Sequence, residues 1–83
     1  MQLQVGMIVC ACAGKERNQY YLIIQQDEHY VYLADGRHRR LQNPKRKNPK
    51  HVRPTGIRYN IDGMTDKALR QKLRLLKGGN KFV

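Results

Sequence analysis

The chain has 83 residues, which is enough for one small domain. It carries 17 Lys and Arg against 6 Asp and Glu, a formal net charge of +11 at pH 7, and this excess indicates a polyanionic partner, above all nucleic acid. No apolar run reaches the ~20 residues of a membrane span, and the first residues lack the basic and apolar regions of a signal peptide, so we expect a cytoplasmic protein.

Two strands joined by a charged turn are predicted near the N-terminus. The apolar residues 7–13, closed by Gly14, predict the first strand, and residues 20–26 predict the second because aromatic and β-branched residues favour strands. The charged turn between them consists of residues 15–18, and it ends on Asn18, the residue other than glycine that best tolerates positive φ. We expect Ile8 and Cys10 to face the core.

A third strand and a tight hairpin follow. The polar residues 27–29 predict a turn, and residues 30–34 a strand. Asp35-Gly36 is typical of a two-residue type I′ turn. We therefore expect residues 37–41 to return at once as a fourth strand, with Tyr32 opposite Arg39.

The segment 37–58 holds nine of the 17 basic residues and no acidic one. Two Asn-Pro-Lys triplets, at 43–45 and 48–50, predict a rigid loop rather than a central strand, since proline removes a backbone donor. Residues 51–55 predict a short edge strand that Pro54 ends.

The last predicted element is an amphipathic helix. Residues 56–63 form a connector in which Ile57, Tyr59 and Ile61 alternate. Thr65 is the expected N-cap, and Met64 and Leu69 stand at the N′ and N4 positions of a hydrophobic staple. The apolar stripe consists of Ala68, Leu69, Leu73 and Leu76, and the polar face of Lys67, Arg70, Gln71, Lys72 and Arg74.

These elements predict a barrel with basic loop and connector over residues 1–63, a helix packed on it over 64–77, and a flexible tail over 78–83. Gly78-Gly79 is expected to end the helix.

Several motifs occur together in one order along the chain. They are Ala13-Gly14-Lys15, Leu33-Ala34-Asp35-Gly36, Arg40-Leu41-x-x-Pro44-Lys45 and Lys50-His51-Val52-x-Pro54-Thr55, followed by the capped helix. The pattern from Val5 to Leu22, strand, glycine, basic loop, strand, resembles the KOW motif, with Asn18 where that motif usually has glycine.

The whole set, from about Val5 to Leu76, resembles the small bacterial KOW-domain RNA-binding proteins related to large-subunit ribosomal proteins of archaea and eukaryotes. This resemblance implies a mostly β fold, a small SH3-like (KOW) β-barrel followed by a C-terminal α-helix. It also implies binding to ribosomal RNA or the ribosome in a translation-related role.

Basic side chains in the loops are the candidate RNA contacts, because each phosphate that a cation neutralises releases counterions and so adds salt-sensitive affinity. The candidates are Lys15, Arg17, Arg37, Arg39, Arg40, Lys45, Arg46, Lys47, Lys50 and Arg53. The five tyrosines could stack on unpaired bases, but a small barrel needs such bulk in its core, and we favour the core.

Other chemistry finds little support in the sequence. Cys10, Cys12 and the three histidines match no zinc spacing, and the cysteines are expected to be reduced thiols. There is no plausible carboxylate pair and no P-loop, so we expect no enzyme, metal or cofactor.

A protein-interaction role stays open as the alternative. KOW barrels also dock on protein partners, so an adaptor in a transcription or translation complex, with the amphipathic helix as the contact, would fit the same sequence. We expect a monomer in either case.

Overall fold

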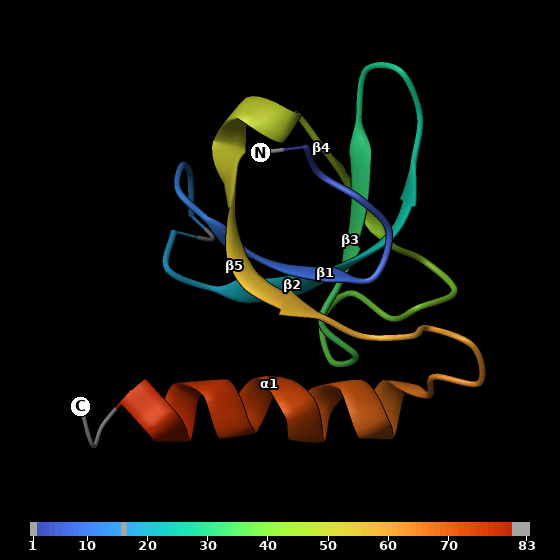
Figure 1. The fold of residues 1–83 in the computed structure, drawn as a ribbon, viewed down its shortest axis with the longest axis vertical. Helices are drawn as coiled ribbons and strands as arrows, with labels where there is room; N and C mark the ends of the chain where they lie inside the picture. Colours follow the sequence, from blue (N-terminus) through green and yellow to red (C-terminus); the bar gives the residue numbers. More distant parts are fainter. Residues whose placement is uncertain (1, 16, 81–83) are drawn as a thin grey trace.

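The computed structural model describes residues 2–15 and 17–80, which form an antiparallel β-sheet followed by one long helix (Figure 1). The elements in chain order are β1 (Met7–Ala11), β2 (Tyr20–Gln26), β3 (Val31–Ala34), β4 (Lys45–Lys47), the 3-10 helix η1 (Pro49–His51), β5 (Val52–Arg58) and α1 (Asp66–Asn80). The five strands lie in the order β4-β3-β2-β1-β5. The expected mostly β fold with a C-terminal helix is confirmed.

Both faces of the curled sheet are covered, which gives the protein two hydrophobic clusters. Strand β2 supplies both by simple alternation: Tyr21 and Ile23 enter the cluster on the face away from α1, and Leu22 enters the cluster beneath α1. The first cluster contains Val9, Ala11, Tyr21, Ile23, Val31, Leu33 and Val52. The second contains Ile8, Leu22, Ala34, Leu69 and Leu73.

The prediction of one inward face for β1 is therefore wrong in part. Ile8 is buried as expected, but Cys10 is only half-buried, while Val9 and Ala11 on the opposite face are 0% and 1% exposed. A strand buried on both faces carries apolar residues in both alternating sets, so its sequence does not identify a single core face.

The predicted two-residue hairpin does not form. Gly36 has a φ of +78° but Asp35 does not have positive φ, and the residues 37–41 make a loop instead of a strand. The Asp35 carboxylate accepts hydrogen bonds from the backbone N–H groups of Arg37 (2.8 Å) and Arg39 (2.9 Å). These hydrogen bonds from the side chain to the backbone compete with a tight turn, and residues 35–44 form a longer loop instead.

The partner of β3 is β4, which lies in the segment predicted as a rigid loop. Lys45, Arg46 and Lys47 stand opposite Leu33, Tyr32 and Val31, so Tyr32 faces Arg46 and not Arg39. Pro44 and Pro49 lie outside the strand, so its backbone donors are intact, and β4 is an edge strand.

Strand β5 is the other edge of the sheet, as predicted, but Pro54 does not end it. It continues to Arg58, because a proline on an edge strand need not break the ladder. At the register shift in β1, the Thr55 hydroxyl donates to the Ile8 carbonyl oxygen at 2.8 Å. Since β4 and β5 are edges joined by η1, the sheet is open and not a closed barrel.

Helix α1 begins as the sequence predicts. The Thr65 hydroxyl accepts a hydrogen bond from the Ala68 N–H at 3.1 Å, and Met64 packs against the cluster beneath the helix that contains Leu69. The helix continues through Gly78 and Gly79 to Asn80, and the prediction that these glycines end it is wrong. Glycine weakens a helix by about 1 kcal/mol but permits its dihedral angles. The rest of the predicted tail, 81–83, lies outside the described residues.

The β1–β2 turn allows a direct test of the local backbone. Asn18 has a φ of +70°, and its N–H donates to the Ala11 carbonyl oxygen at 2.9 Å. Asn18→Gly should leave stability unchanged or slightly higher, whereas Asn18→Val should cost about 1–2 kcal/mol because β-branched residues resist positive φ. Thermal unfolding followed by circular dichroism measures both, and equal melting temperatures would contradict this assignment.

Candidate nucleic-acid interface

The loop 35–44 is fixed against the N-terminal half of α1 by backbone and side-chain contacts. Gly36 lies so close to α1 that a Cβ there would stand 2.4 Å from the Asp66 carbonyl oxygen. The Arg70 Nη1 atom donates to the Gly36 carbonyl oxygen at 2.7 Å, and Asp66 Oδ1 accepts from the Leu41 N–H at 2.8 Å. The arginines of this loop therefore stand in a defined position relative to the helix.

A groove of about 510 Å³ lies between this loop, α1 and the start of β2. We call it the arginine groove. Four arginines line it, two from the loop and two from the helix, and an aromatic and an apolar side chain complete its surface with two further polar residues. Its lining consists of Arg37, Arg40, Arg70, Arg74, Tyr20, Leu73, Gln19 and Asp35. Leu73 is buried and Tyr20 half-buried.

The arginine groove is strongly cationic. Among the described residues that line it, one is acidic, Asp35. The Asp35 carboxylate accepts hydrogen bonds from two backbone N–H groups of the loop. Between described residues, the ion pairs within 4 Å involve histidine alone, His29 with Glu28 and His38 with Asp35. Four arginines against one carboxylate leave the described lining of the groove with a net positive charge, so the groove can accept an anion.

A second group of cations lies on β4 and η1. The Arg46 guanidinium carbon stands 4.6 Å from the centre of the Tyr30 ring, a cation–π contact. Lys45 and Lys47 flank it on β4, and Lys50 is exposed on η1. This arrangement places four cations along the edge strand and the turn that follows it.

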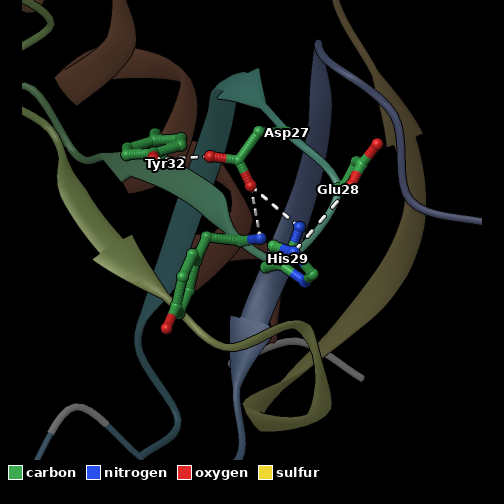
Figure 2. A network of polar contacts seen from close by, with 5 residues as sticks. Asp27, Glu28, His29 and Tyr32 are labelled. Atoms are coloured by element: carbon green, nitrogen blue, oxygen red, sulfur yellow. Dashed lines mark hydrogen bonds and ion pairs between the residues drawn. The ribbon is translucent and has the colours of Figure 1, made fainter.

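Asp27 in the β2–β3 turn makes a network of hydrogen bonds that reaches Tyr32 of β3 (Figure 2). Asp27 Oδ1 accepts from the N–H groups of His29 (2.9 Å) and Tyr30 (2.8 Å), and its Oδ2 accepts from the Tyr32 hydroxyl (2.8 Å). Hydrogen bonds, first that from the His29 N–H and then that from the Tyr32 hydroxyl, lower the pKa of Asp27. The same Asp27 bond raises the pKa of Tyr32. Asp27 thus stays ionised, and Tyr32 neutral, at neutral pH.

The predicted RNA contacts divide among several elements. Arg37 and Arg40 meet in the arginine groove, while Arg39 is exposed on the same loop. Lys45, Arg46, Lys47 and Lys50 lie together on β4 and η1. Lys15 and Arg17 are exposed in the β1–β2 loop, and Arg53 is exposed on β5, the edge opposite β4.

Arg70 and Arg74 of α1 were not among the predicted contacts. Their spacing of four residues, on either side of Leu73, places them on one side of a helix and was visible in the sequence. Which loop they would face depends on how the helix packs on the sheet, and the sequence pattern does not contain that information.

No protein-family model and no curated protein matches this sequence. The described residues offer no metal site. Cys10 and Cys12 are free thiols, and within residues 2–15 and 17–80 no group of three or more His, Cys, Asp or Glu could hold a metal ion. The helix described here is too short and too polar to cross a membrane.

The contact between the loop and α1 can be tested with two glycine variants. Gly36 (φ +78°) and Gly63 (φ +71°) share the same backbone strain upon substitution, but a Cβ at Gly63 meets nothing within 4 Å. Gly63→Ala should cost about 1–2 kcal/mol from the positive φ alone. Gly36→Ala should cost a further 1–3 kcal/mol, roughly, because its Cβ collides with the Asp66 carbonyl. Equal losses in denaturant unfolding would show that the loop does not pack on the helix as described.

Proposed function

We propose that this protein is a KOW-type RNA-binding module that acts on ribosomal RNA or the ribosome in the cytoplasm, in a translation-related role. The observation that carries the proposal is the arginine groove, where two elements far apart in the sequence bring four arginines together. The net charge of +11 and the ordered set of sequence motifs support it.

Phosphate binding follows from the chemistry of these side chains. A guanidinium group presents planar donors that match two phosphate oxygens at once, and it stays charged at any physiological pH. Each neutralised phosphate releases condensed counterions, which adds affinity that rising salt removes. The arginine groove and the cations of β4 and η1 would each contact the RNA backbone in this way.

A protein-interaction adaptor is the second candidate. On the surface of the described residues, one large hydrophobic side chain is strongly exposed: Leu75 on α1, which is 74% exposed. A single exposed leucine is common on soluble proteins and marks no interface by itself, whereas the described lining of the arginine groove carries four cations and one carboxylate. RNA binding is therefore the function that the geometry supports best.

Salt dependence provides the test. The affinity of the protein for a fluorescent structured RNA should fall steeply as salt rises, and the triple variant Lys45→Ala, Arg46→Ala, Lys47→Ala should bind more weakly. Its plot of log affinity against log salt should be flatter by up to about three phosphate equivalents. Fluorescence anisotropy at several salt concentrations measures both quantities.

The matched control is Lys45→Arg with Lys47→Arg, which keeps all three charges on β4 and should keep the wild-type slope. Circular dichroism confirms that each variant is folded. A folded triple variant with unchanged affinity and slope would exclude β4 from the interface. Wild-type protein that binds no RNA at low salt would overturn the proposed function and favour the adaptor.

A further inference from the structure

The arginine groove has a feature that phosphate binding alone does not require. Besides four cations, it presents an aromatic side chain, Tyr20, and a buried aliphatic one, Leu73, both packed in the cluster beneath α1. A surface that only follows an RNA backbone needs charge and hydrogen-bond donors, not an apolar floor. The combination of cations and apolar surface matches a nucleotide, which has a phosphate and a flat, weakly polar base.

The size of the groove fits a ligand of this kind. Its volume of about 510 Å³ lies within the range of roughly 300–1,000 Å³ usual for small-molecule sites. One of its cations is also held in place before binding, since Arg70 Nη1 donates to the Gly36 carbonyl oxygen. A guanidinium has five N–H donors, so Arg70 keeps others for a phosphate while losing less side-chain entropy on binding.

We propose that the arginine groove binds one unpaired RNA nucleotide, with its phosphates held by arginines of the loop and α1 and its base against Tyr20 and Leu73. This inference rests on the proposed RNA-binding function and names the structural class of RNA. In a double helix the bases are stacked inside and paired, so they cannot enter a groove between a loop and a helix. A bulged or looped nucleotide can leave the stack and do so.

The test compares two RNA stems that differ by one nucleotide. One labelled hairpin is fully paired, and the other carries a single unpaired nucleotide in the middle of the stem. At fixed salt, anisotropy should show that the wild type binds the bulged stem about ten-fold more tightly. Arg37→Ala with Arg74→Ala should lower this preference to near one-fold, because each wall of the groove loses a cation.

Two controls separate the groove from general charge and from folding. Arg58→Ala removes an exposed cation at the end of β5 and outside the groove, so affinity for both stems should fall equally and the preference should stay. Tyr20→Phe keeps the ring and should keep the preference, while Tyr20→Leu should lower it about five-fold or more. Circular dichroism establishes that every variant is folded.

Each other outcome overturns the inference. Tight, salt-dependent binding of both stems without preference would leave the proposed RNA-binding function intact and exclude a nucleotide site in the groove. Equal loss for both stems in the Arg37–Arg74 variant would mean phosphate contact only. If polyglutamate of the same charge displaced the bulged stem as well as unlabelled RNA does, the groove would be a site for an acidic protein segment.

Discussion

The packing of α1 on the outer face of the sheet is the interaction on which the rest of the structure depends. Leu69 and Leu73 are 0% and 6% exposed, against Ile8, Leu22 and Ala34 of the sheet. Burying a leucine side chain stabilises a protein by about 1.5–3 kcal/mol, a large share of the stability available to a domain of this size. The same packing forms one wall of the arginine groove, so the candidate site exists only while the helix is docked on the sheet.

The acidic residues explain how so basic a chain keeps its cations available. Asp27, Asp35 and Asp66 each accept hydrogen bonds from backbone N–H groups, at the β2–β3 turn, in the loop 35–44 and between that loop and α1. These three of the six acidic residues thus act on the backbone, where they set the shape of turns. Asp35 lines the arginine groove, but among the described residues no ion pair within 4 Å joins these three carboxylates to an arginine.

Local signals in the sequence predicted much of the fold. The bounds of β2, the positive φ of Asn18 and the cap formed by Thr65 depend on residues close in sequence, and all three are confirmed. The Asp35-Gly36 hairpin failed because Gly36 serves a contact with α1, 30 residues away, and Asp35 captures loop N–H groups.

The candidate site was less predictable than the fold for the same reason. The basic residues of the loop 35–44 could be recognised from charge, but Arg70 and Arg74 join Arg37 and Arg40 only through tertiary packing. The face of β1 was undecidable from its pattern because the sheet is covered on both sides. When the conformation of a segment depends on a contact with a distant part of the chain, the local sequence pattern does not predict that conformation.

The measurement that tests the central claim most directly is NMR of isotope-labelled protein titrated with a bulged RNA stem, following backbone amides and arginine side-chain N–H signals. The arginine groove should account for the largest changes, at Arg37, Arg40, Arg70 and Arg74, with smaller changes along β4. Changes centred on Leu75 and the outer face of α1, with the groove signals unmoved, would contradict RNA binding in the groove.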